Sequence, residues 1–251
     1  MIPNPIRKVL SSMRAHRVHV LLMGGQACVF YGAAEFSRDT DFAILADSAN
    51  LARLRKSLAD LQAKVIAVPP FEFEYLRRGH AVHFRCQHPE AMGMRIDIMS
   101  RMRGVDPFPK LWRRRTTIEL PDKTTTDLMS LPDLVQAKKT QRDKDWPMIR
   151  RLVESHYFEN RDTATSAQIK FWLQELRTPE LLIEVASTRQ SLCRAIARKR
   201  SLVTHAMAGE TRELEEALQA EEKTERERDK LYWSPLKKEL ERLRHARRDE
   251  A

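Results

Sequence analysis

The chain has 251 residues, of which 42% are hydrophobic and 7% aromatic, so it can bury a substantial core and is longer than one minimal domain requires. The chain carries a net charge of +10. Residues 210–251 hold 11 Lys/Arg against 13 Asp/Glu, so the basic excess lies in the first 209 residues. This excess favours a polyanionic partner such as RNA or an NTP. No apolar run approaches the ~20 residues of a membrane span, and no signal-peptide pattern opens the chain. The three cysteines, Cys28, Cys86 and Cys193, form no disulfide framework. We therefore expect a cytoplasmic protein without membrane contact.

The N-terminal elements follow from apolar spacing. Ile6 to Arg14 has the period of an amphipathic helix, and Val18 to Met23 has the composition of a buried strand. Gly24-Gly25 ends this strand, and Gln26 to Gly32 has helical character. Glycines at a strand-to-helix turn let backbone N–H groups approach a phosphate closely, and the helix N-terminus adds partial positive charge.

A pair of acidic residues, Asp39 and Asp41, opens the next strand. Residues i and i+2 of a strand point to the same face, so the two carboxylates lie a few ångströms apart and require a cation between them. Oxygen ligands of this kind suit Mg²⁺ together with substrate phosphates. A surface turn that solvates a strand end is the alternative, but the apolar run Phe42 to Leu45 indicates that the acids begin a buried strand.

The following segment predicts three further elements. Asp47 or Ser48 can cap a helix that runs to about Leu61. Lys64 to Val68 is expected as a strand, and Phe71 to Cys86 as a hairpin turning at Arg77-Arg78-Gly79. Four residues of this region could be zinc ligands: His80, His83, Cys86 and His88. Strand alternation places His83 on the opposite face from the other three, so no zinc site is expected. His83 and Arg85 are instead candidates to line a cleft.

A third carboxylate, Asp97, lies within the short strand Met94 to Met99 between Ile96 and Ile98. An acidic side chain in such a strand is costly to bury unless it is paired or bound to metal. If this strand lies beside the strand of Asp39, the three carboxylates converge into a two-metal site for phosphoryl transfer.

With its Gly24-Gly25 pair, Asp39-x-Asp41 and a later Asp97, the sequence resembles the DNA polymerase β-type nucleotidyltransferase superfamily, in particular the small bacterial members that include AbiEii-like toxins. The resemblance covers about residues 18–155. It implies an α+β fold with a mixed twisted sheet and helices, and the transfer of a nucleoside monophosphate from an NTP such as ATP to an acceptor hydroxyl. Asp39, Asp41 and Asp97 would then be the catalytic residues and the ligands of Mg²⁺ or Mn²⁺.

The same resemblance implies which residues bind the nucleotide. Gly24 and Gly25 would hold the triphosphate, and Ser37 and Arg38 lie between them and the acids. Family members often carry a helix with Leu, Lys and an Arg-x-Lys-Asp run; the matching residues here are Leu134, Lys138, Arg142, Lys144 and Asp145. Lys138 and Arg142, four residues apart, would share a helix face and reach the triphosphate, whereas a solvated basic face is the alternative.

The chain also departs from the family pattern. Thr40 replaces the aliphatic residue that usually separates the two acids, and Ala34 and Glu35 stand where many relatives have an arginine. A register with Asp41 as the first acid would place Ala43 at the second position. These departures leave open a degenerate fold that binds nucleotide or RNA without chemistry.

The arginine run Arg113-Arg114-Arg115 is expected on a loop or strand edge, where it solvates the surface or contacts RNA or the triphosphate. The rest of the chain is expected to be helical. Helices are expected over 143–158, 165–176, 179–187 and 190–207. Residues 210–248 are expected to form a solvated helix or a helical hairpin, and the break at Ser234-Pro235 favours the hairpin. The expected parts are a catalytic core (1–130), a helical region completing the cleft (131–209) and a charged extension (210–251). Expected partners are an NTP, an RNA or tRNA acceptor and, by the toxin likeness, an antitoxin protein; a protein side chain or an antibiotic-like small molecule is the alternative acceptor.

Overall fold

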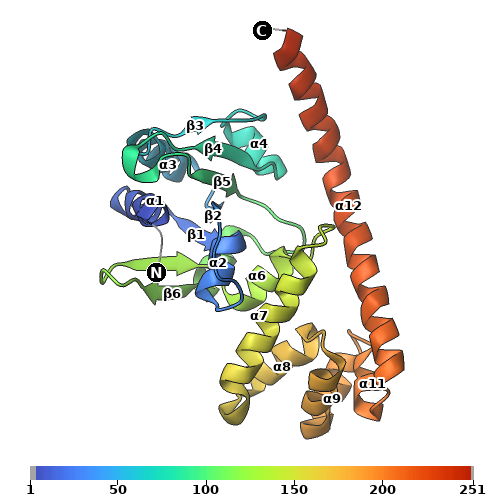
Figure 1. Ribbon diagram of the computed structural model, residues 1–251. Helices are drawn as coiled ribbons and strands as arrows, with labels where there is room; N and C mark the ends of the chain where they lie inside the picture. The colour runs from blue at the N-terminus through green and yellow to red at the C-terminus, as the bar shows by residue number, and fades with distance from the viewer. Residues whose placement is uncertain (1–3, 250–251) are drawn as a thin grey trace. The chain divides into compact units, whose positions relative to one another are not determined.

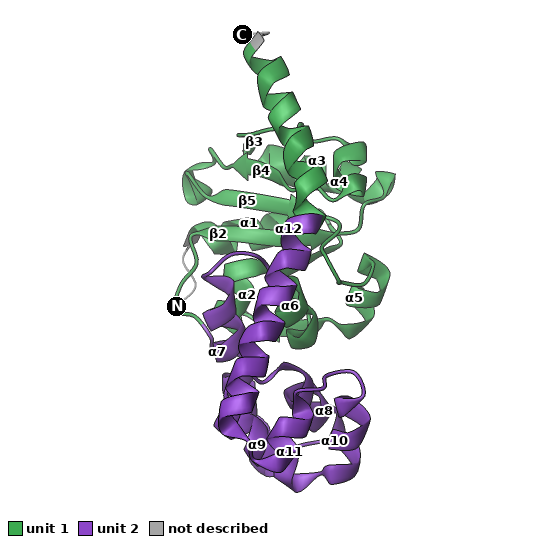
Figure 2. Ribbon diagram, turned by 90° about the vertical axis from the view of Figure 1, so that its right-hand side faces the viewer, with its two compact units in different colours: residues 1–30, 34–137, 232–251 green, residues 31–33, 138–231 purple. Residues whose placement is uncertain are grey.

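The computed structural model describes residues 4–249, which form an α+β structure with one mixed seven-stranded sheet and a long C-terminal helix (Figure 1). The chain divides into two compact units (Figure 2). Unit 1 comprises residues 1–30, 34–137 and 232–251, and unit 2 comprises residues 31–33 and 138–231. None of the helices within residues 4–249 has both the length and the hydrophobicity that crossing a bilayer requires.

Unit 1 contains the whole sheet, whose strands are hydrogen-bonded in the order β3-β4-β5-β2-β1-β7-β6. The strands are β1 (Val20–Met23), β2 (Asp39–Ile44), β3 (Lys64–Val65), β4 (Val82–Arg85), β5 (Arg95–Met99), β6 (Thr116–Glu119) and β7 (Thr125–Leu128). The helices of unit 1 are α1 (Asn4–Ala15), α2 (Gly24–Phe30), α3 (Ser48–Asp60), α4 (Phe73–Arg78), the 3₁₀ turn η1 (Pro89–Ala91), α5 (Phe108–Arg114) and α6 (Leu131–Ala137).

The central strands pack their apolar residues on one face of the sheet. In the parallel β2–β5 pair, Thr40 and Phe42 lie opposite Ile96 and Ile98, and all four are buried. Burying an aliphatic or aromatic side chain stabilises the fold by about 1.5–3 kcal/mol. Because strand residues alternate between faces, the intervening acidic residues project from the other face of the sheet.

Several predicted elements are confirmed. α1 and β1 form where the apolar spacing placed them. The cap of α3 is Asp47, whose side chain accepts a hydrogen bond of 2.6 Å from the N–H of Asn50. Such a cap satisfies one of the backbone donors that the first helical turn leaves free.

The hairpin expected over 71–86 is wrong, because Phe73–Arg78 forms the helix α4 and only Val82–Arg85 forms a strand. Gly79 ends α4 in the left-handed conformation at φ 103°, and its N–H bonds the carbonyl of Leu76. The Arg-Arg-Gly run is therefore a helix C-terminus, where basic residues and a left-handed glycine are both favoured. The strand expected over 64–68 is also shorter, since β3 contains two residues.

The arginine run lies in and directly after the last turn of α5 instead of in a loop or strand edge. Arg114 bonds Asp133 at 2.7 Å, and Arg115 bonds Asp127 at 3.0 Å. Both partners belong to unit 1, so two of the three cations are neutralised within it.

Unit 2 is helical, and its elements are α7 (Asp145–Asn160), the 3₁₀ turn η2 (Arg161–Thr163), α8 (Ser166–Glu175), α9 (Pro179–Thr188), α10 (Gln190–Ala197), α11 (Val203–Ala208) and the first part of α12 (Thr211–Asp249). Helices α7 to α9 follow the expected spacing. The single helix expected over 190–207 is interrupted after Ala197, where the chain turns to bury Arg200.

The helical hairpin expected at Pro235 is wrong, because α12 continues through this residue as one helix of 39 residues. Proline lacks the N–H that the helix ladder uses, so local sequence favours a break there. Contacts within unit 1 hold the helix directly after Pro235: Leu236 is buried, and Glu239 bonds both Arg78 and the buried His80 at 2.7 Å. Tertiary contacts therefore override the local signal.

Candidate functional site

The three predicted acidic residues project from one face of the sheet in unit 1. β5 lies beside β2 and runs parallel to it, so the condition under which the three carboxylates share one face is met. Asp41 is in register with Asp97, and Asp39 with Arg95, while His83 of β4 is in register with Asp97 from the other side. Residues paired in register share a face, so these side chains gather on one surface of three adjacent strands.

The two glycines leave room for side chains of the site. Gly24 has φ +66°, and a Cβ added there would fall 2.5 Å from the carboxyl carbon of Asp41. A Cβ added at Gly25 would fall 2.7 Å from the hydroxyl of Ser37, which donates to the carbonyl of Asp39 at 3.0 Å. Since α2 begins at Gly24, directly after β1, the turn positions the carboxylate of Asp41 against the start of this helix.

Arg95 holds the third carboxylate. Its Nε donates to Asp97 Oδ1 at 2.8 Å and its Nη2 to Oδ2 at 2.9 Å, a bidentate pair. His83 Nδ1 lies 2.9 Å from the same Oδ1. Sequence reasoning missed Arg95, although its position two residues before Asp97 on the same strand face is a signal that could have identified it.

The electrostatics show that Arg95 interacts with all three acids. The pKa of Arg95 is raised first by its hydrogen bond to Asp97 and further by the charges of Asp97, Asp39 and Asp41. Burial acts to raise the pKa of Asp97, but hydrogen bonding with His83 and Arg95 and the charges of these two residues together outweigh burial, so this pKa lies below its ordinary value. The guanidinium therefore balances negative charge that would otherwise be uncompensated.

The donor set of this face consists of carboxylate oxygens, which suit Mg²⁺ or Mn²⁺. In the arrangement observed, however, no group of three or more His, Cys, Asp or Glu side chains among the described residues is placed to hold a metal ion. Arg95 donates two hydrogen bonds to the carboxylate of Asp97, and a metal ion bound to this carboxylate would replace them. The residue types fit the cation, and their present hydrogen bonds are made to Arg95.

Two further residues of the sequence prediction flank Asp39 along the chain. Arg38 is exposed on the segment that precedes β2. Thr40, the residue that departs from the family pattern, is fully buried on the opposite face, where its hydroxyl donates to the sulfur of Met94 at 3.6 Å. The threonine therefore fills core space and does not enter the carboxylate face.

Lys138 and Arg142 do not share a helix face, because α6 ends at Ala137 and α7 begins at Asp145. Both residues belong to the connecting loop in unit 2 and both donate to Asp145, at 3.3 and 2.8 Å. Thr140 donates to the same carboxylate at 2.6 Å. Burial tends to raise the pKa of Asp145, but Lys138, Thr140 and Arg142 lower it below its ordinary value. A buried acid with three local donors favours a loop over a continuous helix.

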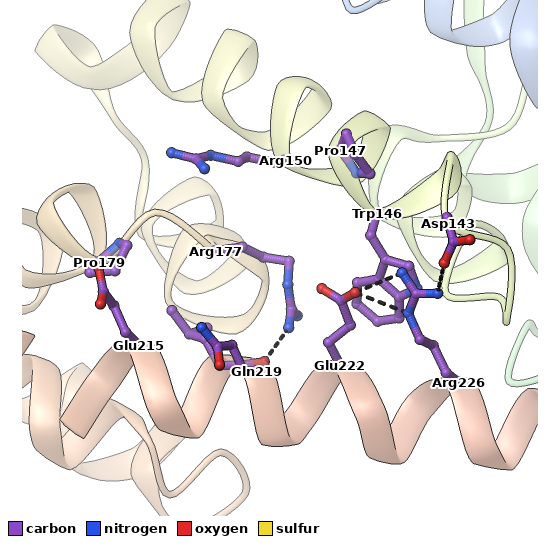
Figure 3. A pocket seen from close by; sticks show the side chains of 11 residues that line it. Asp143, Trp146, Pro147, Arg150, Arg177, Pro179, Glu215, Gln219, Glu222 and Arg226 are labelled. Carbon is purple, nitrogen blue, oxygen red and sulfur yellow. Dashed lines mark hydrogen bonds and ion pairs between the residues drawn. The ribbon is translucent and has the colours of Figure 1, made fainter. Parts of the chain in front are cut away.

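Unit 2 also contains a cavity of about 490 Å³ between α7, the segment before α9, and α12 (Figure 3). Arg177 lies over the ring of Trp146 with its guanidinium carbon 4.7 Å from the centroid. The arginines of the lining are each held by a carboxylate: Arg150 by Glu154, Arg177 by Glu221, and Arg226 by Glu222 and Asp143. The pairs Arg177–Glu221 and Arg226–Asp143 join α12 to other segments of unit 2, whereas the remaining two lie within single helices.

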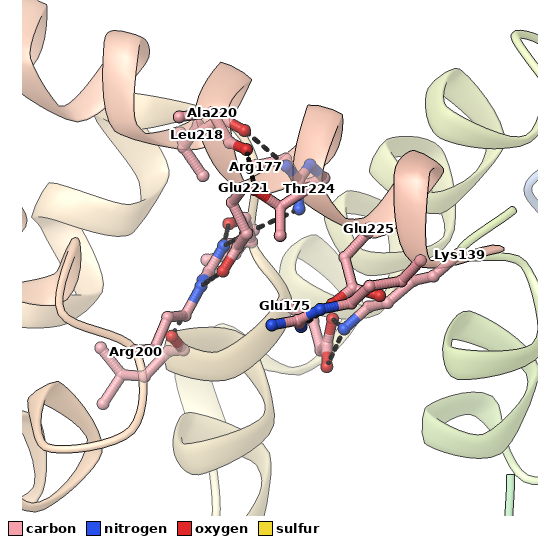
Figure 4. Close-up of polar contacts among 12 residues, drawn as sticks. Lys139, Glu175, Arg177, Arg200, Leu218, Ala220, Glu221, Thr224 and Glu225 are labelled. Carbon is pink, nitrogen blue, oxygen red and sulfur yellow. Dashed lines mark hydrogen bonds and ion pairs between the residues drawn. The ribbon is translucent and has the colours of Figure 1, made fainter. Parts of the chain in front are cut away.

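The adjoining polar cluster has the same structural character (Figure 4). Glu221 accepts from both Arg177 and Arg200 at 2.9 Å, and Lys139 bonds Glu175 at 2.7 Å. Burial tends to raise the pKa of Glu221, but the two arginines lower it below its ordinary value. The cluster fixes α12 to the other helices of unit 2.

The comparisons with known proteins assign no family. No protein-family model matches the chain, and no curated protein matches it significantly.

Proposed function

We propose that the protein is a metal-dependent nucleotidyltransferase with a polymerase β-type core, which transfers a nucleoside monophosphate from an NTP to a hydroxyl of an RNA acceptor such as tRNA. The observation that carries this proposal is the register of Asp41 with Asp97 on adjacent parallel strands, with Asp39 on the same face. The left-handed Gly24 against Asp41 supports it further. The resemblance of these motifs to toxin-type enzymes extends the proposal to an antitoxin partner.

The proposed reaction forms a bond between the acceptor oxygen and the α-phosphorus and breaks the bond from this phosphorus to the bridging oxygen, so that pyrophosphate leaves. A Mg²⁺ or Mn²⁺ ion held by Asp39, Asp41 and Asp97 would supply charge neutralisation and activate the hydroxyl. The lowered pKa of Asp97 makes it a weak base while Arg95 and His83 bond it. Proton transfer to Asp97 therefore requires Arg95 to release this carboxylate.

Label transfer tests the proposal. The protein is incubated with α-³²P-labelled NTPs, Mg²⁺ and total RNA or lysate, and the products are separated by electrophoresis so that RNA, protein and small-molecule acceptors are distinguished. We expect labelled RNA with wild type and a loss of at least about 100-fold with Asp39→Asn or Asp41→Asn. Glu35→Gln, which removes a nearby exposed carboxylate, is the control and retains activity. Label transfer that survives both aspartate substitutions refutes the proposal.

A binding module without chemistry is the second candidate, and Arg95 is the observation that favours it. An arginine fork that already neutralises Asp97 provides by itself the cation that the carboxylates require. In this case the face would bind a nucleotide without a divalent ion.

Calorimetry separates the two candidates. For an enzyme, removal of Mg²⁺ weakens NTP binding, and Arg95→Met strengthens Mn²⁺ binding because the competing cation is gone. For a binding module, NTP affinity is independent of Mg²⁺ and falls in Arg95→Met. Arg14→Met is the control for Arg95, since Arg14 is an exposed arginine of α1, outside the three strands that carry the acids.

A further inference from the structure

The segment between Glu184 and Glu210 contains no acidic residue but several basic ones, which are Arg189, Arg194, Arg198, Lys199 and Arg200. The structure separates these residues into two groups. Arg200 is 7% exposed, bonds Glu221 through Nη2 at 2.9 Å, and donates to the carbonyls of Leu173 and Leu176. It is a structural residue of unit 2.

The other basic residues are exposed, and within residues 4–249 their side chains make no hydrogen bond or ion pair. We call these four residues, Arg189, Arg194, Arg198 and Lys199, the α10 patch. Arg194 and Arg198 are four residues apart and lie on the same side of α10 and its C-cap, while the others flank them along the chain. In Figure 2, α10 lies with α8, α9 and α11 at one end of unit 2.

On α12 of unit 2, by contrast, exposed arginines are paired with acidic residues of the same helix. On α12, Arg212 bonds Glu216 at 3.2 Å and Arg228 bonds Glu225 at 2.8 Å. The α10 patch lacks such acidic neighbours, so its positive potential is available to a partner. A polyanion binds such a patch most favourably, because each phosphate that a basic side chain neutralises releases a counterion and so adds to the binding free energy.

Within residues 4–249, the α10 patch has no exposed large hydrophobic residue near it in the sequence, which favours a nucleic acid over a protein or a membrane as its partner. Among the described residues, the large exposed hydrophobic side chains are Phe36, Val65, Ile66, Phe73, Met92, Phe158 and Leu231, all outside 185–209. Protein interfaces have an apolar centre, and helices that bind membranes insert apolar residues. A phosphodiester backbone requires neither, and arginine forks match phosphate geometry.

We propose that the α10 patch binds the phosphate backbone of RNA. The inference deepens the proposed function by assigning a surface to the acceptor, and it rests on that proposal for the role of the RNA but not for the binding itself.

Binding of fluorescein-labelled total tRNA, measured by anisotropy over a range of salt concentrations without NTP or metal, tests the inference. The variant Arg194→Gln/Arg198→Gln/Lys199→Gln should bind about 10- to 100-fold more weakly at 0.1 M salt, and the slope of log Kd against log salt should fall by about 2 to 3. Lys170→Gln/Lys223→Gln/Lys230→Gln removes the same charge from exposed sites of unit 2 and is the matched control. Its affinity should stay within about twofold of wild type.

Charge-preserving substitution and a second ligand complete the design. Arg194→Lys/Arg198→Lys should retain most of the affinity, and circular dichroism should show native helix content in every variant. Equal losses in the two triple variants, or binding to vesicles of phosphatidylserine and phosphatidylcholine but not to tRNA, would overturn the inference. Because Asp39→Asn/Asp41→Asn should bind tRNA as wild type does, absence of label transfer with intact binding refutes the enzyme and leaves the patch standing.

Discussion

Gly24 offers the sharpest test of how the site is built, because Gly24→Ala changes one methyl group at the contact with Asp41. Alanine in the left-handed region costs about 1–2 kcal/mol of folding free energy. In addition, the new Cβ would fall 2.5 Å from the carboxyl carbon of Asp41. Carbon atoms separate optimally at about 3.5 Å, so this carboxylate must retreat by about 1 Å.

Such a displacement matters more for function than for stability. A misplacement of about 1 Å at a reacting group costs about 100-fold in rate. We therefore expect Gly24→Ala to reduce label transfer by about 100-fold and to weaken Mn²⁺ binding measured by calorimetry, while the free energy of unfolding measured in urea falls by only about 1–2 kcal/mol.

Gly93→Ala is the matched control within unit 1. Gly93 has φ +76°, and no atom of the described part of the chain lies within 4 Å of a Cβ added there. It should therefore lose the same stability through backbone strain but retain label transfer and Mn²⁺ binding. If both variants lose activity equally, the contact between Gly24 and Asp41 does not position this carboxylate, and the reasoning fails.

Three further predictions concern stability, measured by urea unfolding. Asp97→Asn should be less stable than wild type at pH 7. Because the pKa of Asp97 is lowered in the folded state, this difference in stability should shrink as the pH falls below about 4. A difference that stays constant with pH contradicts the Asp97–Arg95 pair. Arg200→Met should cost about 3–5 kcal/mol by leaving Glu221 without one of its buried partners; a loss under 1 kcal/mol contradicts this role. Pro235→Ala should stabilise α12 by up to about 3 kcal/mol, since it restores the missing N–H; destabilisation would show that the proline ring makes a necessary contact.

The parts of the fold that follow from local sequence were predictable. The strand, glycine turn and acidic strand between residues 18 and 45 carry their signals within a few residues of each other, as does the cap at Asp47. The apolar residues beside Asp97 predicted a strand with one buried face, but its pairing with β2 was only a condition of the interpretation. Alternation and capping are short-range rules, so a single sequence contains the information they need.

The errors arise where a distant or buried partner decides the conformation. Pro235 remains helical because Glu239, four residues later, binds a buried histidine far away in the sequence. The helix expected through Lys138 and Arg142 breaks because both side chains turn to the buried Asp145. Neither partner can be identified from periodicity, which describes the face of an element but not the groups that cover it.

The same limit applies to the carboxylate face and determines what remains to be measured. Three acids on one surface require a compensating cation, and the sequence pattern alone suggests a metal. The structure shows an arginine of the same strand in the fork position at Asp97. An enzyme and a binding module therefore share the same fold and the same acids, and they differ in one free energy, that of exchanging the Arg95 fork for a divalent cation. If the exchange is favourable in the presence of an NTP, the face is a catalytic centre; if it is not, the arginine is its permanent cation.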